Sequence, residues 1–392
     1  MGPAHEPPVE SKGAASRTGI AALDSSRRPR RILHIVSSLG VGGMERMLLQ
    51  LSTAQQEAGH RVSVLALRAG ALEQEAADRS IRARVLSSGA GRLGRSLEAL
   101  RCFWEENPDI VHVHNPTSLQ YAVLSKLVSQ PAIVVTIHGD QDTHARLGSS
   151  FEWRFTSTTV IVSDAAVKTL RLPAHAGRLI VVRNGVAAVP DNPKNREDAR
   201  AEFSARDACV GILVARIDGR KGHLTLLKSL SAMNDPGRAL TLWIVGDGPA
   251  RPAAETEAAR LGMGHDRVIF LGRRFDIDRL LEGADFFVLP SDIEGIPMSI
   301  LEAMAHGLPI IASNVGGIPE IIEHDVNGLL VPAGDDRALA SAIHRVATDP
   351  ALRSRLGEAA RKCANTTFSL SAMVDRYDEV YDEALAGRSA RR

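Results

Sequence analysis

A chain of 392 residues is too long for one ordinary hydrophobic core, so two domains are expected. Hydrophobic residues make up 44% of the chain and charged residues 24%, which is typical of a soluble globular protein. The formal net charge of +1 excludes an overall electrostatic attraction to nucleic acid.

The cysteines and the apolar runs indicate a cytoplasmic protein. Cys102, Cys209 and Cys363 lie far apart and show no metal-ligand spacing, so we expect reduced thiols. No apolar run approaches the roughly 18 residues that a membrane span requires. Contact with the inner face of the plasma membrane would therefore be peripheral.

The N-terminal segment is rich in Pro, Ala, Ser and Gly and lacks the apolar core of a signal peptide. We expect residues 1–30 to form a disordered tail that ends in the basic cluster at 27–31. This cluster could contact anionic lipid, or it could simply remain solvated.

From residue 31 onward, short β-rich runs alternate with helical ones, the pattern of a parallel sheet covered on both faces. The runs predict strands at 32–37, 62–67, 110–114, 133–138, 160–162 and 179–182. The apolar spacing within 45–58 predicts a helix. We assign 31–190 to a first Rossmann-like domain that would bind the acceptor.

A polar, proline-containing stretch at 191–206 is interpreted as the linker, after which the alternation restarts. Strands are predicted at 210–215, 240–245, 268–271, 286–289, 309–312 and 329–331. Helices are predicted at 221–233, 251–261, 277–282, 298–305 and 337–347. Residues 207–368 would form a second Rossmann-like domain, 369–386 a helix crossing back to the first, and 387–392 a basic tail.

The most informative motif follows the strand at 286–289. Glu294 lies in the loop, Pro297 fits the first helical position, and Glu302 falls in the second turn of the helix that Gly307 ends. Loop amides and a helix N-terminus attract an anion, and two carboxylates offer acceptors to hydroxyl groups. A phosphate flanked by sugar hydroxyls describes a nucleotide sugar, although an isolated pair would equally fit a capping and a solvated carboxylate.

Two further turns lie at predicted strand ends. Arg216 and Lys221 flank the glycine-containing turn after 210–215, where each could form charge-assisted hydrogen bonds with a diphosphate. The turn at 37–45 contains Gly42 and Gly43, which would let a substrate approach backbone amides. It lacks the dinucleotide-binding spacing, and the second strand ends in Arg68 rather than an acid.

These residues resemble glycosyltransferase family 4, whose members have the GT-B fold and retain the anomeric configuration. The resemblance covers about 31–386 and includes the two glutamates at 294 and 302, the run 303–309, the segment 313–320, and shorter matches at 42–45, 246–249 and 327–330. It is strongest to bacterial enzymes of surface or exopolysaccharide assembly. It implies two domains that face each other across a cleft.

The resemblance also implies roles. Glu294 would contact the donor sugar and Glu302 the ribose, while Arg216 and Lys221 would hold the diphosphate as it leaves. The expected catalytic residues are Glu294, Arg216, Lys221 and His138. The expected donor-binding residues are Gly42, Gly43, Arg216, Lys221, Gly246, Arg273, Glu294, Gly295, Ile296, Met298 and Glu302, with no metal and no cofactor.

Three other patterns need an interpretation. Asp276 and Asp278 match the metal motif of another glycosyltransferase fold, but we interpret them as helix-capping residues. His112 and His114 share one face of a strand and are interpreted as lining or hydrogen-bonded histidines, since no third ligand is evident. A stripe of Leu and Trp with interleaved Arg at 92–104 is interpreted as a core face with snorkelling arginines, the alternative being a membrane-docking helix.

The sequence thus predicts sugar transfer from a nucleoside diphosphate sugar, with UDP or GDP as the nucleotide, to a hydroxyl acceptor. The acceptor would be a glycan, most simply a lipid-linked one. Two rivals remain, a nucleotide-sugar 2-epimerase of the same fold and an inactive sugar-nucleotide-binding protein. An epimerase needs acid and base carboxylates in the first domain, where no comparable set is found.

Overall fold

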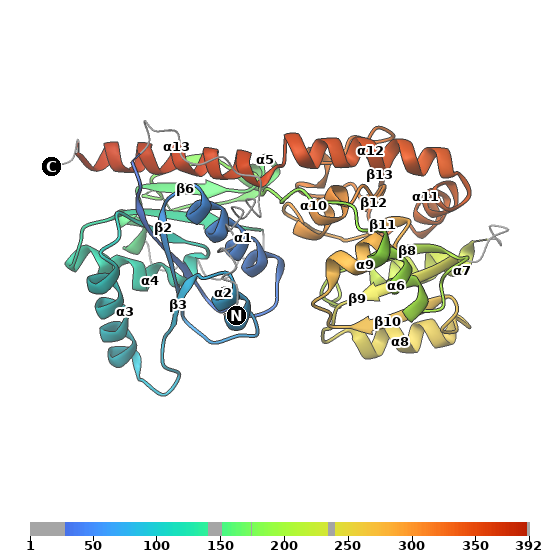
Figure 1. Cartoon of the computed structure of the whole chain (residues 1–392), viewed down its shortest axis with the longest axis horizontal. Coiled ribbons are helices and arrows are strands. Elements are labelled where there is room, and N and C mark those ends of the chain that lie inside the picture. The colour runs from blue at the N-terminus through green and yellow to red at the C-terminus, as the bar shows by residue number, and fades with distance from the viewer. Residues whose placement is uncertain (1–27, 140–150, 174, 234–239, 390–392) are drawn as a thin grey trace, which may run out of the picture.

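The computed structural model describes residues 28–139, 151–173, 175–233 and 240–389. These form two α/β domains that lie side by side, joined along one edge by the last two helices (Figure 1). None of the described helices combines the length and the hydropathy that a bilayer-spanning segment needs.

The first domain is a seven-stranded parallel sheet in the order β3-β2-β1-β4-β5-β6-β7. Its strands are β1 Arg31–Val36, β2 Arg61–Ala66, β3 Arg82–Val85, β4 Ile110–Val113, β5 Ala132–Ile137, β6 Thr158–Ile161 and β7 Arg178–Val181. Its α-helices are α1 Gly43–Glu57, α2 Glu73–Asp78, α3 Arg92–Glu106, α4 Leu119–Ala122 and α5 Asp164–Thr169. Short 3-10 helices are η1 Pro116–Ser118, η2 Val123–Leu127 and η4 Glu152–Phe155.

The second domain is a six-stranded parallel sheet in the order β10-β9-β8-β11-β12-β13. Its strands are β8 Cys209–Val214, β9 Leu240–Val245, β10 Val268–Gly272, β11 Phe286–Leu289, β12 Ile310–Ser313 and β13 Gly328–Val331. Its helices are α7 His223–Ala232, α8 Arg251–Arg260, α9 Ile277–Gly283, α10 Met298–Ala305, η5 Ile318–Glu320, α11 Asp336–Thr348 and α12 Pro350–Thr366. In both sheets the strand order reverses beside the first strand of the domain, where such folds bind ligands.

The segment expected to be a linker contains a helix, α6 Pro193–Glu202, which packs against α9 of the second domain. Its Arg200 is buried and donates to the Gly283 carbonyl (2.9 Å) and to the Asp285 carboxylate (2.6 Å). This stretch therefore belongs to the packed body of the second domain. Its polar composition suggested a loop, but Arg196 and Arg200 hydrogen-bond to the end of α9 and to Asp285 just before β11.

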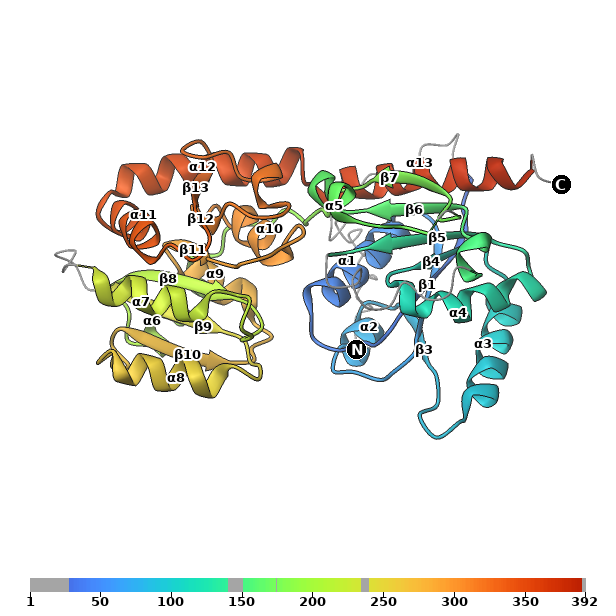
Figure 2. The same cartoon turned by 180° about the vertical axis from the view of Figure 1, so that it is seen from behind.

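The final helix, α13 Leu370–Ser389, packs against α1 and β5, as predicted for a helix that crosses back to the first domain. Both views show α12 in line with α13 above the two sheets (Figures 1 and 2). At the crossing, Val186 donates its N–H to the Phe368 carbonyl and accepts from the Leu370 N–H, both at 2.8 Å. The two segments that connect the domains are thus hydrogen-bonded to each other.

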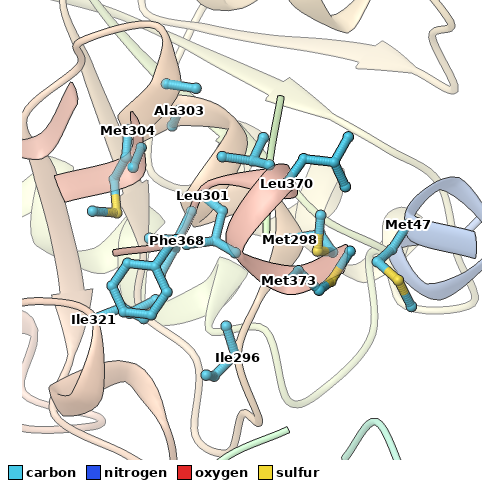
Figure 3. Packing of buried hydrophobic residues seen from close by; sticks show 14 of the residues in the cluster. Met47, Ile296, Met298, Leu301, Ala303, Met304, Ile321, Phe368, Leu370 and Met373 are labelled. Atoms are coloured by element: carbon cyan, nitrogen blue, oxygen red, sulfur yellow. The ribbon is translucent and has the colours of Figure 1, made fainter. Parts of the chain in front are cut away.

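One apolar cluster continues through this junction. Met298 and Leu301 of α10, Phe368, and Met373 of α13 belong to the same buried cluster as Met47 of α1 (Figure 3). Burial of this surface joins the domains at the base of the cleft.

Two sequence interpretations are wrong at this level. Arg30, assigned to a disordered tail, is 6% exposed and pairs with Asp378 (2.8 Å) and Asp382 (2.5 Å) of α13. The apolar stripe of α3 is not a core face, because Leu93 is 75% exposed and Trp104 is 74% exposed. The helix buries another face instead, through Ala99, Cys102, Phe103 and Glu106.

Candidate active site

A pocket of about 990 Å³ opens between the two sheets and is lined from both domains. It collects residues from the ends of β1, β5, β8, β9 and β11, which are far apart in sequence. The predicted site residues that line it are Gly42, Gly43, His138, Arg216, Lys221, Gly246, Arg273, Glu294, Ile296, Met298 and Glu302.

Gly295 is the predicted donor-binding residue that does not line the pocket. It lies at the contact between the domains, where a Cβ would come within 2.9 Å of the His138 carbonyl oxygen. Gly316 supports the same loop from behind with a φ of +53°, and a Cβ there would lie 1.8 Å from the Glu294 carbonyl. The glycines at 295 and 316 are therefore required for close backbone approach.

The helix after this loop begins at the predicted position, but Pro297 lies just before it rather than at its first helical position. Pro297 is the N-cap of α10 with extended backbone, and Met298 is its first residue. Pro297, Met298 and Ser299 all line the pocket, so the N-terminus of α10 faces it. Unpaired N–H groups at a helix start favour an anion at this position.

The loop after β8, which carries Lys221, is bound directly to the loop after β11, which carries Glu294. Lys221 donates from Nζ to Glu294 Oε1 at 2.5 Å, and the same oxygen accepts from Ser291 Oγ at 2.8 Å. Gly222 has a φ of +68°, and a Cβ there would lie 1.8 Å from the Pro290 carbonyl oxygen. This packing fixes the ammonium group and the carboxylate relative to one another.

Further cations surround this pair. The structure records no hydrogen-bond or ion-pair partner for the side chains of Arg216 and Arg273 among the described residues, and both line the pocket. Arg274 lines it as well, but its guanidinium pairs with Asp276 (2.8 Å) and Glu202 (3.2 Å). Arg216 and Arg273 are therefore available to a ligand that carries negative charge.

Glu302 faces the pocket from the second turn of α10. Burial raises the pKa of its carboxyl to about 7, against the opposing effect of the nearby Arg46. A nearby negative charge on Asp278 acts in the same direction as burial. Glu302 is thus an acid that exchanges its proton near neutral pH.

His138 directly follows β5 and lines the pocket from the first domain. Its Nε2 lies 3.1 Å from Nδ1 of His114. Burial lowers the pKa of His138 to about 4, so its ring is neutral near pH 7 and acts as a hydrogen-bonding group rather than a cation.

The glycine-rich turn closes the pocket at the start of α1. Gly42 is the N-cap, and a Cβ on it would lie 2.3 Å from Glu45 Oε2. A Cβ on Gly43 would lie 3.4 Å from Cβ of Met298, so this turn packs over the start of α10. A side chain at position 43 would thus be in van der Waals contact with the second domain, and one at position 42 would displace the Glu45 carboxylate.

Several lining residues were not predicted as site residues: Glu45, Arg46, Asn184, Asp247 and Ser299. The Asn184 amide donates to the Ile296 carbonyl at 3.3 Å, which links the first domain to the loop before α10. Glu45 and Arg46 directly follow the glycine turn, so their place at the start of α1 was the available signal.

The two-aspartate motif behaves differently from the capping interpretation. Asp276 is the N-cap of α9, but no side-chain capping bond forms, because its carboxylate pairs with Arg274 and Arg279 at 2.8 Å each. The Asp278 carboxylate lies 3.1 Å from Nε2 of His306. Each carboxylate thus has a side-chain partner.

His112 and His114 share one face of β4, as predicted, and a third histidine lies beside them. β1 and β4 pair with His34 opposite His112, and the three rings lie close enough to share a metal ion. The sequence interpretation missed His34 because the pairing of β1 with β4 is a property of the fold. All three rings are buried, and burial holds the pKa of each below its usual range.

Family comparisons match the two halves of the chain separately. Residues 41–188 match the model described as "Glycosyltransferase Family 4", and residues 208–349 match the model "Glycosyl transferases group 1".

Individual proteins extend the comparison. The lipopolysaccharide core biosynthesis glycosyltransferase LpsD of Rhizobium meliloti is 34% identical over 58% of this chain and 64% of its own length. The UDP-Gal:alpha-D-GlcNAc-diphosphoundecaprenol alpha-1,3-galactosyltransferase of Escherichia coli is 26% identical over 72% of this chain and 78% of its own. The crystal structure of Anabaena HepE with UDP and glucose superposes with a TM-score of 0.78 at 22% identity, covering 90% of this chain and 99% of that one.

Proposed function

The chain belongs to glycosyltransferase family 4 and has the GT-B fold, and on this basis we propose that it transfers a sugar from a nucleoside diphosphate sugar to a hydroxyl acceptor. The observation that carries the proposal is the pocket between the domains, where cations and carboxylates converge at strand ends. A nucleotide sugar combines a charged diphosphate with hydroxyl-rich groups on both sides, which matches that lining.

The cations would serve the diphosphate. Arg216 and Lys221 lie on the loop after β8, and the N-terminus of α10 faces the same space. Preorganised positive charge at this position stabilises the negative charge that grows on the leaving group. We assign this work to protein cations without a metal, and activity should therefore persist in EDTA.

The carboxylates would serve the hydroxyl groups. Glu294 is held by Lys221 and Ser291 at the centre of the pocket, where it would orient the transferred sugar together with His138. Glu302 lies further along α10 and would accept hydrogen bonds from the ribose. Polar groups placed on both sides of the diphosphate position the donor for reaction.

We propose transfer with retention of configuration. The acceptor oxygen attacks the anomeric carbon on the face that the diphosphate leaves, the carbon–oxygen bond to the diphosphate breaks, and a phosphate oxygen takes the acceptor proton. The cations at Arg216 and Lys221 favour this course, because they would hold the departing diphosphate beside the sugar.

The test is a panel of UDP- and GDP-sugars, scored by release of free nucleotide with and without acceptor. Release that depends on acceptor supports transfer, and the anomeric coupling of the product in NMR reports retention or inversion. Change at C2 of the donor sugar without acceptor would indicate the epimerase. That reaction needs an acid and a base carboxylate from the first domain, whose described residues supply one, Glu45, to the pocket. Binding without turnover of any donor would indicate the inactive protein.

We further propose that the acceptor is a lipid-linked glycan reached at a membrane surface. The Escherichia coli relative acts, by its name, on a diphosphoundecaprenol-linked acceptor. On this chain, Leu93, Leu97 and Trp104 form an exposed apolar stripe on α3, with Leu127 of η2 exposed nearby and Arg92 on the same helix. Apolar side chains interleaved with arginine suit the interface of an anionic bilayer.

Vesicle co-sedimentation tests this contact. Binding to phosphatidylglycerol vesicles should exceed binding to phosphatidylcholine vesicles, and Leu97→Glu should abolish it. Leu224→Glu, at an exposed position on α7 of the second domain, is the matched control. Because Trp153 and Trp243 are fully buried, a blue shift of tryptophan emission on binding would report Trp104. Unchanged binding of the Leu97→Glu protein would reject α3 as the contact.

A further inference from the structure

A continuous chain of buried hydrogen bonds runs behind the pocket, from the crossover helix to His138. Gln55 of α1 and Tyr381 of α13 form one end, where Gln55 Nε2 donates to the Tyr381 hydroxyl at 3.2 Å. Gln55 Oε1 lies 2.8 Å from Nε2 of His34. The chain continues from His34 Nδ1 to His114 Nε2 (2.9 Å) and from His114 Nδ1 to His138 Nε2 (3.1 Å).

The residues behind His138 are sealed from solvent. Gln55, His34, His114 and Tyr381 each have no exposed surface. Burial lowers the pKa of His34 to about 4 and holds that of His114 well below its usual value, so both rings are neutral near pH 7. A neutral imidazole carries one N–H, so it donates on one side and accepts on the other.

This constraint gives the chain a direction. The amide oxygen of Gln55 can only accept, so His34 carries its proton on Nε2 and accepts at Nδ1. His114 must then donate from Nε2 and accept at Nδ1. His138 in turn donates from Nε2, which leaves its Nδ1 without a proton.

We propose that Gln55 is a positioning residue that fixes, through two buried histidines, which ring nitrogen of His138 carries the proton. His138 then presents Nδ1 as a hydrogen-bond acceptor to the pocket. An acceptor suits a sugar hydroxyl, which can donate, and disfavours a carboxylate at the same place. Only this identification of the ligand rests on the proposed function.

Tyr381 is the partner of the amide nitrogen in this orientation. Its hydroxyl accepts from Gln55 Nε2 and lies 2.8 Å from Nδ1 of His112, to which it can donate. His112 Nε2 lies 2.7 Å from the hydroxyl of Thr136, so this branch is also satisfied. Reversing the amide would reverse every donor and acceptor as far as His138. One side chain therefore sets the state of the whole chain.

A metal ion is the alternative ligand of this cluster. His34, His112 and His114 are close enough to share an ion. However, both ring nitrogens of each histidine already lie between 2.7 and 3.1 Å from a hydrogen-bonding partner. A metal would have to break these bonds, so the hydrogen-bonded chain is the arrangement that the geometry supports.

Long-range proton–nitrogen NMR on ¹⁵N-histidine-labelled protein at pH 7.5 tests the proposal, because it distinguishes the two neutral tautomers. The His138 signals are assigned from their loss in His138→Asn. We expect Nε2–H at His138 in the wild type. Gln55→Met removes the acceptor of His34, and reversal of the chain would relieve that unpaired N–H, so a shift of His138 toward Nδ1–H is expected.

Gln56→Met is the matched control, since Gln56 is on the same helix and its amide bonds the Ser80 carbonyl instead. If Gln55→Met fails to fold, Tyr381→Phe removes the partner that orients the amide and should give mixed tautomers, with Tyr121→Phe as its control. A pure Nδ1–H at His138 in the wild type would overturn the proposal. So would an unchanged tautomer in both variants, or stoichiometric metal in the purified protein.

Kinetics add a second readout once a donor is known. Gln55→Met should lower kcat about tenfold, as loss of a supporting hydrogen bond commonly does, with little change in the KM for donor. An equal effect of Gln56→Met would indicate general destabilisation and count against the positioning role. If no donor is turned over, the proposed function fails, while the NMR result still decides this inference.

Discussion

Glu302→Gln should stabilise the protein at neutral and alkaline pH while weakening nucleotide binding. Burial raises the pKa of the Glu302 carboxyl from 4.5 to about 7 in the folded chain. Between these values the folded protein holds a proton that the unfolded chain has released, so the free energy of unfolding falls as pH rises. Glutamine does not titrate, so the free energy of unfolding of the variant does not fall with pH for this reason.

The magnitude follows from the size of the shift. Each pKa unit is worth about 1.4 kcal/mol, so a displacement from 4.5 to about 7 corresponds to about 3 kcal/mol. The variant should match the wild type near pH 4.5 and gain stability progressively up to pH 7. Above pH 7 the difference should stay constant, because both states of the wild type are then ionised.

Urea unfolding of both proteins from pH 4.5 to 8.5 measures this difference. Subtracting the two curves cancels the contributions of other titrating groups. Glu358→Gln on α12, where the side chain is exposed, serves as the control and should show no such trend. Calorimetry with the free nucleoside diphosphate should show weaker binding to Glu302→Gln. A stability difference that does not vary with pH would refute the reasoning.

Three other outcomes are expected. Arg216→Ala and Lys221→Ala should each lower kcat about 10²-fold at saturating donor, through loss of charge at the leaving group, and near wild-type rates would contradict this assignment. Glu294→Gln should lower kcat with little effect on nucleoside diphosphate affinity by calorimetry, whereas loss of nucleotide binding would reassign this residue to the nucleotide. Burial lowers the pKa of His34 from 6.5 to about 4. Between these pH values the unfolded chain binds a proton at His34 that the folded chain does not bind. The unfolding free energy should thus fall on acidification across this range, and His34→Gln should reduce that slope by about 1.4 kcal/mol per pH unit in urea titrations.

The sequence predicted most of the two sheets because buried parallel strands form continuous apolar runs. β3 escaped because it is an edge strand, reading Arg-Ala-Arg-Val, with two exposed residues and no apolar run. α6 was missed because it carries few apolar residues, and two of its arginines instead bind carbonyl groups at the end of α9. The stripe on α3 was assigned to the core because helical periodicity identifies a face without revealing what covers it.

The site was easier to predict where local sequence carries the geometry. Glu294 and Glu302 lie on one loop and helix, so their spacing alone brought them together. The histidine chain could not be found this way, since it joins Gln55, three strands and a helix more than 300 positions later in the chain. Gly295 was assigned to the donor from the family resemblance, whereas in the structure it lies where the domains touch.

The paired crossing at Val186 and Phe368 has a mechanical consequence. A single connecting segment would let the two domains bend and twist freely relative to each other. Two connecting segments that are hydrogen-bonded side by side restrict twisting of one domain against the other. They leave rotation about the line through the two crossings. Motion of the domains should then follow one arc. Along that arc the glycine turn at 42–43 and the start of α10 should separate and return to the same relative position. The same pocket should therefore re-form each time the domains close.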